Sequence, residues 1–270
     1  MQARPDDDSG TLPVVKNFLF SVPIPRLSKI DHDRMMMEPT TTMTSKEDIV
    51  DCGSNEDMLK QRLEMEPRAV FNSRGTKEGD PVNLIVVGEF TTILAAFGSR
   101  WDETEVTGLQ SGMKTVKSFV LGSQYRYSPI SPLYIYGRSQ DFALQRARSS
   151  INQRLHLRLW MSNMEFEGKP VWVGQVSRDI GVHLAPIFPG TTHKIDPYVD
   201  EARDYVLSDL IRAGHVDRFT YVNGVGVSTE DNPRKNLGGD PYTTNGKRAV
   251  IILSPTKTEK TKLLDWEEHV

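Results

Sequence analysis

Among the residues that can do acid–base chemistry near neutral pH, this 270-residue sequence contains six histidines. His156 and Arg158 lie two residues apart in the alternating segment 154–160, which places both on one face of a predicted strand. His156 could then act as a general acid or base while Arg158 binds a phosphate or carboxylate. Two other interpretations stay open: His156 could be one ligand of a metal site, or both residues could have purely structural partners.

A second group of candidates precedes the helix predicted over 197–213. The N-terminus of a helix attracts anions, so His193 is a candidate catalytic residue and Lys194 a candidate substrate contact. His193, Asp196 and Asp200 could also bind a divalent metal together. Asp196 could equally cap the helix, and Asp200 could lie on a solvated helix face.

Positive charge is concentrated in the middle of the chain. Residues 112–160 hold eight lysines and arginines and one aspartate, a net charge of +7, although the whole chain carries −3. Arg138 and Arg154 belong to this stretch and are candidate contacts for an anionic substrate. The stretch could form an anion-binding surface, or acidic segments elsewhere could neutralise it. The negative total charge argues against a specific nucleic-acid partner.

Several reaction classes and locations are excluded by what the sequence lacks. It has no Gly-x-Ser-x-Gly elbow, phosphate-binding Gly-x-x-x-x-Gly-Lys-Ser/Thr loop or dinucleotide fingerprint, and its one cysteine, Cys52, has no neighbouring histidine. The longest apolar stretch, 84–97, contains Glu89 and is too short to span a bilayer. The first residues are acidic and do not resemble an export signal, so we expect a cytoplasmic protein.

The order of predicted elements indicates an α+β fold, with a mixed or antiparallel sheet packed against two or three helices. We expect an irregular acidic, proline-rich arm over 1–67 with one short helix, an α+β domain over 68–256 and a polar tail over 257–270. Glu167 and Gly168 should form a hairpin turn, and Gly214 should end the long helix. The predicted helices cover 54–66, 91–97, 110–121 and 197–213, and the predicted strands cover 82–87, 133–136, 154–160, 169–177, 219–222 and 248–253.

Five short blocks of this sequence resemble, in the same order, segments of the LssY C-terminal domain family. The resemblance covers roughly residues 80–254. The blocks are SPLYIYGR at 131–138, LHLRLW at 155–160, KPVWVG at 169–174, THKIDP at 192–197 and GDPYTTNG at 239–246.

The resemblance implies that the protein binds or acts on a phosphate ester. In some members a domain of this kind is joined to a membrane-embedded phosphatidic-acid-phosphatase type 2 domain, whose helices and catalytic segments this chain does not contain. Association of that kind suggests a phosphorylated lipid or another phosphate ester as ligand, by analogy alone. The positions that match the family segments are His156, Arg158, Asp179, His193, Asp196, Asp200 and Asp204.

Two functions from different classes follow from these observations. The first is a phosphoester hydrolase or other phosphate-ligand enzyme, with or without a divalent metal, that acts on a small phosphorylated or lipid-derived ligand. In it, His156, Arg158 and His193 are catalytic, while Arg138, Arg154 and Lys194 contact the substrate. The alternative is a non-catalytic module that uses the basic stretch to dock on an anionic lipid surface or an acidic protein partner, as peripheral membrane contact would require.

Overall fold

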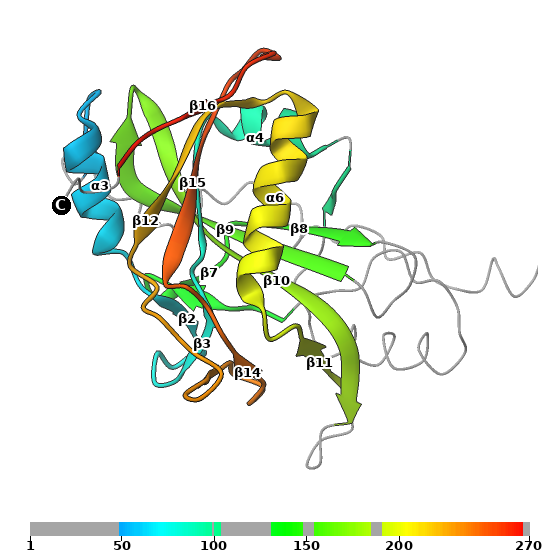
Figure 1. Ribbon diagram of the computed structural model, residues 1–270. Coiled ribbons are helices and arrows are strands. Elements are labelled where there is room, and N and C mark those ends of the chain that lie inside the picture. Colours follow the sequence, from blue (N-terminus) through cyan, green and yellow to red (C-terminus); the bar gives the residue numbers. More distant parts are fainter. Residues whose placement is uncertain (1–48, 99, 104–130, 148–153, 185–190, 267–270) are drawn as a thin grey trace, which may run out of the picture. The chain divides into compact units, whose positions relative to one another are not determined.

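Strands outnumber helices in the computed structural model, which describes residues 49–98, 100–103, 131–147, 154–184 and 191–266 (Figure 1). Three helices occur in these residues: α3 (Glu56–Glu64), α4 (Phe90–Phe97) and α6 (Val199–Ala213). The strands are β1 (Val50–Asp51), β2 (Ala69–Phe71), β3 (Glu78–Pro81), β4 (Leu84–Val87), β5 (Asp102–Glu103), β6 (Tyr134–Ile135), β7 (Arg138–Ser139), β8 (Phe142–Ala147), β9 (Arg154–Phe166), β10 (Lys169–Leu184), β11 (Thr191–Ile195), β12 (Val216–Asn223), β13 (Arg234–Lys235), β14 (Pro241–Tyr242), β15 (Lys247–Leu253) and β16 (Lys262–Leu263).

The main sheet is mixed, which confirms the predicted α+β class. It has ten strands in the order β16-β12-β15-β4-β10-β9-β8-β5, with β1 paired to β9 and β11 paired to β10. The pairs β4–β15, β12–β16 and β1–β9 are parallel, and the other pairs are antiparallel. A second sheet of four strands has the order β3-β2-β6-β7.

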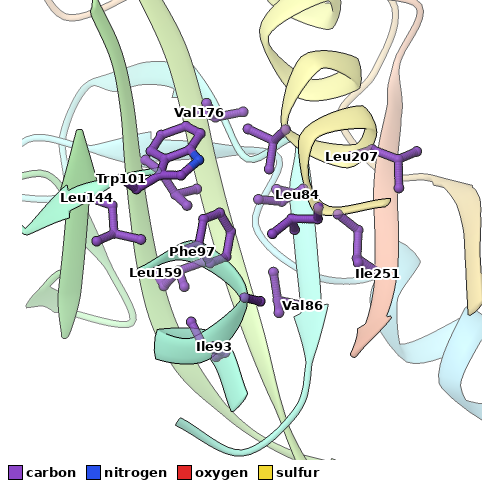
Figure 2. Packing of buried hydrophobic residues seen from close by; sticks show 14 of the residues in the cluster. Leu84, Val86, Ile93, Phe97, Trp101, Leu144, Leu159, Val176, Leu207 and Ile251 are labelled. Carbon is purple, nitrogen blue, oxygen red and sulfur yellow. The ribbon is translucent and has the colours of Figure 1, made fainter. Parts of the chain in front are cut away.

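Each face of the main sheet carries its own hydrophobic core. In β4, Leu84 and Val86 belong to one core and Ile85 and Val87 to the other, because successive side chains of a strand point to opposite faces. This is why 84–87 is an unbroken apolar run. The first face packs against α4 and α6, as Figures 1 and 2 show. The second face packs against α3 and the four-stranded sheet.

The β9–β10 hairpin confirms the alternation predicted from the sequence. In β9, the odd-numbered side chains Leu155, Leu157 and Leu159 point into the first core. The even-numbered side chains point to the opposite face of the sheet. Glu167 and Gly168 form the predicted turn, with φ of 53° and 67°, so both residues adopt the left-handed conformation of a two-residue hairpin. Both strands are longer than predicted. Their pairing extends from Phe166 and Lys169 next to the turn to Arg154 and Asp179 at the far end.

The starts of two helices differ from the prediction. α6 begins at Val199, after Pro197, and Tyr198 is its N-cap residue, so the predicted cap by Asp196 is wrong. The Asp196 carboxylate instead accepts the backbone N–H of Tyr198 in a turn just before the helix, 2.9 Å away. α3 begins at Glu56, after the predicted start at residue 54, and its N-cap is Asn55, whose side chain accepts the N–H of Met58.

Other predicted boundaries agree more closely with the structure. Gly214 ends α6 with φ of 77°, as predicted, and α4 ends at Gly98. The predicted helix over 110–121 and the first 48 residues of the arm lie outside the described residues. The compact unit that contains the sheets spans Asp48–Val270. It therefore includes α3 and the segment after residue 256, which contributes Leu264 and Trp266 to the second core.

No helix among the described segments combines the length and the apolar character needed to cross a bilayer.

Candidate functional site

The second face of the main sheet carries a row of polar side chains where an apolar core would be expected. On β9, Arg154, His156 and Arg158 are 3%, 5% and 7% exposed. The neighbouring strand β10 places Asp179 opposite Arg154 and Gln175 opposite Arg158. Burial of so many polar groups costs free energy unless partners or a ligand satisfy them.

We define the polar cluster as six buried residues that carry this chemistry. Hydrogen bonds join His156 to Asp179 and Arg158 to Gln175. Electrostatic interactions link Asp80, Arg154, Arg158 and Asp179. The six are Asp80 from β3, Arg154, His156 and Arg158 from β9, and Gln175 and Asp179 from β10.

His156 and Asp179 form a short contact in the polar cluster. His156 Nε2 lies 2.7 Å from Asp179 Oδ2, and both side chains are almost fully buried. Because an ionised carboxylate only accepts hydrogen bonds, this contact assigns the imidazole proton to Nε2. Asp179 thereby fixes the ring, and Nδ1 is the atom through which neutral His156 would take up a proton.

Arg158 is anchored at one end and unpartnered at the other. Its Nη1 donates to Gln175 Oε1 at 2.8 Å, and its Nη2 donates to the backbone carbonyl of Ser131 at 3.3 Å. Its Nε has no hydrogen-bond partner. Burial lowers the pKa of the Arg158 guanidinium, and the negative charges of Asp80 and Asp179 oppose that change.

Asp80 reaches the polar cluster from the smaller sheet. Asn236 donates a side-chain hydrogen bond to its carboxyl group, while Asp80 Oδ1 has no partner. Burial raises the pKa of Asp80 from 3.8 to about 6, although Arg158 and Asn236 favour the ionised form. Asp240, in the GDPYTTNG block, also lies near Asp80 and accepts the backbone N–H of Ile195.

The shifted pKa of Asp80 predicts how stability depends on pH. Between about pH 4 and 6 the folded protein keeps a proton on Asp80 that the unfolded chain has released, so the free energy of unfolding falls as pH rises through this window. The contribution is roughly 3 kcal/mol at about 1.4 kcal/mol per pKa unit. Denaturant unfolding at several pH values should therefore show Asp80→Asn gaining stability relative to wild type from pH 4 to 7.

Glu78→Gln is the matched control, because it removes a carboxylate from the same strand at a partly exposed position. A stability difference between Asp80→Asn and wild type that stays constant over this range would contradict the burial argument.

The structure brings some of the predicted site residues together and leaves others apart. His156, Arg158 and Arg154 all belong to the polar cluster. Arg138 instead pairs with Asp141 at 2.7 Å on a partly exposed part of the surface. Lys194 is exposed on β11.

The residues predicted to bind a metal have other contacts. The Asp196 carboxylate binds the guanidinium of Arg178 and the backbone of Tyr198. Asp200 accepts from Thr244 Oγ1 and from the backbone N–H of Asn245, each at 2.7 Å.

A metal centre at His193 stays a prediction. The backbone of His193 pairs with Val182 in the β10–β11 ladder, and its side chain lies outside the described residues. Elsewhere in the described part of the chain, no group of three or more His, Cys, Asp or Glu side chains is arranged to hold a metal ion.

Sequence reasoning did not select Asp80 or Gln175. Gln175, Ser177 and Asp179 alternate along β10, and this pattern could have been found by the same argument that selected His156 and Arg158. Asp80 comes from a separate sheet, and no local pattern marks it.

Comparison with known proteins identifies a family. The model of a protein family described as the LssY C-terminus matches residues 63–247. No curated protein and no solved structure matches the chain. The matched range contains all six residues of the polar cluster.

Proposed function

Since the chain belongs to the LssY C-terminus family, whose match spans the whole polar cluster, we propose that this cluster is the active site of a phosphoester hydrolase. The observation that supports the proposal is the buried His156–Asp179 pair beside a buried arginine with an unpartnered N–H. A histidine fixed by a carboxylate is an arrangement suited to proton transfer. A guanidinium with a free donor is suited to an anionic ligand.

The energetic cost of Arg158 supports a ligand-binding role. An unsatisfied buried polar group costs about 1–3 kcal/mol, and more when it is charged. The face that it occupies is otherwise continuous with an apolar core around Trp160 and Val173. An anion bound to Arg158 Nε would satisfy the missing hydrogen bond and offset the buried charge.

Hydrolysis at this site would use the chain's own residues. Arg158 binds a non-bridging oxygen of the phosphoryl group and stabilises the charge that develops there. His156 Nδ1 accepts a proton from a water molecule as the water oxygen bonds to phosphorus and the bond to the ester oxygen breaks. The imidazolium is stabilised by Asp179, and its proton then returns to the alkoxide, which leaves as an alcohol. Arg154 adds a second positive charge near Asp179.

The alternative function, docking on an anionic surface, has no specific support in the described residues. Among the arginines of the basic stretch, Arg138 pairs with Asp141 and Arg146 with Asp209, while Arg154 and Arg158 are buried. The remaining basic residues of the stretch lie outside the described residues, so docking stays a prediction. The cytoplasmic location expected from the sequence also stays a prediction.

Binding of inorganic phosphate, the product of the reaction, tests the proposal. By isothermal titration calorimetry, Arg158→Met should weaken phosphate binding by about 10- to 100-fold, the effect of losing one charge-assisted hydrogen bond. Arg138→Met is the control, and it should bind like wild type because Arg138 is committed to Asp141. Arg158→Lys, which keeps the charge, guards against a folding defect, and thermal melting of each variant reports that the fold is intact. Equal phosphate binding by folded Arg158 and Arg138 variants would contradict the proposal.

A further inference from the structure

Arg158 is buried, and both of its hydrogen-bond partners are neutral. Its guanidinium donates to the amide oxygen of Gln175 at 2.8 Å and to the backbone carbonyl of Ser131 at 3.3 Å. Within the residues that the structure describes, no carboxylate forms an ion pair with it, and the charges of Asp80 and Asp179 act on it only through space. A buried charge of this kind is costly unless a ligand compensates it.

Two other buried arginines of this fold have more acceptors than Arg158. Arg203 forms ion pairs with Asp200 at 3.1 Å and with Asp204 at 2.8 Å. Arg248 donates to four backbone carbonyls. The fold can therefore surround a guanidinium with carboxylates or with carbonyls, and at Arg158 it does neither.

Gln175 occupies the position from which a carboxylate would neutralise Arg158. The two residues are directly opposite each other in the β9–β10 ladder, where side chains of opposite charge can pair. Further along the same ladder an aspartate, Asp179, is opposite Arg154. Opposite Arg158 the chain instead has glutamine, which has nearly the shape of glutamate but no charge. Because Gln175 is fully buried, its amide holds the guanidinium firmly without neutralising it.

We infer that Gln175 is a positioning residue of the proposed phosphate site, because its neutral amide holds Arg158 in place and leaves the positive charge of the guanidinium to an anionic ligand. This inference rests on the proposed function and names the group that keeps the site able to bind an anion. A carboxylate at position 175 would hold Arg158 equally well, but it would compete with the anion for the guanidinium and repel it.

Two substitutions of Gln175 separate its hydrogen bond from its neutrality, with inorganic phosphate as the ligand in calorimetric titrations at about pH 7.5. Gln175→Glu keeps an acceptor for Arg158 and adds a negative charge, so it should weaken phosphate binding at least about 30-fold. Gln175→Met removes the acceptor and adds no charge, so it should weaken binding about three- to tenfold.

Denaturant unfolding should rank the two variants in the opposite order. Gln175→Glu should be more stable than Gln175→Met, because it keeps the partner of the buried guanidinium. If Gln175 only supported the fold, the less stable variant would also bind phosphate less tightly. Opposite orders of stability and phosphate affinity therefore identify a role in anion binding.

Gln140→Glu is the matched control for adding a buried negative charge. Gln140 is 7% exposed, and its amide oxygen accepts the backbone N–H of Leu133 at 3.1 Å, a bond that a carboxylate can also accept. Because Gln140 makes no hydrogen bond to Arg158, this variant should bind phosphate within about threefold of wild type. A loss as large as that in Gln175→Glu would overturn the inference, since any buried negative charge would then suffice.

The possible results separate the inference from the proposed function. Wild-type phosphate binding in folded Gln175→Glu, or a larger loss in Gln175→Met than in Gln175→Glu, overturns the inference and leaves an Arg158-dependent phosphate site standing. Absence of phosphate binding by wild type, or unchanged binding in folded Arg158→Met, overturns the proposed function and the inference with it. If Gln175→Glu does not fold, Gln175→Met decides: the expected loss supports Gln175 as the residue that positions Arg158, and unchanged phosphate binding overturns it.

Discussion

Replacing His156 with asparagine is expected to lower turnover of a phosphomonoester such as p-nitrophenyl phosphate by a factor of about 10² to 10⁴, the usual contribution of a positioned acid or base. The imidazole Nε2 lies 2.7 Å from Asp179 Oδ2, a contact that fixes the orientation of the ring. Asparagine keeps a hydrogen-bond donor for Asp179 but cannot accept and return a proton at neutral pH. The loss should therefore appear in kcat, while phosphate affinity changes little.

Two further variants locate the effect at His156. His215→Asn removes a half-buried histidine that contacts the carbonyl of Ser254, and it should leave turnover unchanged. Asp179→Asn should lower kcat because it removes the carboxylate that orients His156. The double variant Asp179→Asn/His156→Asn should be no slower than His156→Asn alone, because the effects of residues that act as a unit are not additive. Wild-type turnover in the folded His156→Asn variant would remove His156 from catalysis.

Replacing Arg248 with methionine is expected to destabilise the fold by roughly 3–5 kcal/mol, the scale for removing one partner from a buried charged network. The side chain is fully buried on β15. Its Nη1 donates to the carbonyl of Leu63, and its Nη2 donates to those of Glu66, Pro67 and Gly224, at 2.7–3.0 Å. These bonds tie the end of α3 and the segment after it to the main sheet, and methionine would leave the carbonyls unsatisfied.

The cost of burying the guanidinium reduces the net stabilisation expected from these hydrogen bonds. Desolvation lowers the pKa of Arg248 to about 10, so part of what the hydrogen bonds contribute is offset by the buried charge. Denaturant unfolding gives the change directly. Arg68→Met is the comparison, since Arg68 forms an exposed ion pair with Glu78 that should contribute at most about 1 kcal/mol. Equal and small losses in both variants would show that the Arg248 contacts are not a major part of the stability.

Much of the fold could be predicted because strand periodicity is a local property. The alternation of leucines with His156 and Arg158 in β9 correctly separated a core face from a polar face, and the apolar run in β4 correctly indicated a strand buried on both sides. Helix starts were less predictable. Asp196 followed by a proline has the composition of a cap, but its carboxylate forms a turn before the helix and binds Arg178.

The candidate site could be predicted only in part, because its members come from separate elements. His156 and Arg158 were found through their shared strand face. Asp80 lies on β3 of the smaller sheet, and its approach to Arg158 depends on how the two sheets pack, which no spacing in the sequence records. Arg138, which was selected from local composition, pairs at the surface with Asp141, three residues away.

A crystal structure of the protein soaked with inorganic phosphate at about pH 7.5 would show whether the polar cluster binds phosphate. We expect a tetrahedral anion within hydrogen-bonding distance of Arg158 Nε, the unpartnered donor of the polar cluster. Phosphate bound elsewhere, with Arg158 Nε satisfied by ordered water or by a protein group, would contradict the assignment of the polar cluster as a phosphate site.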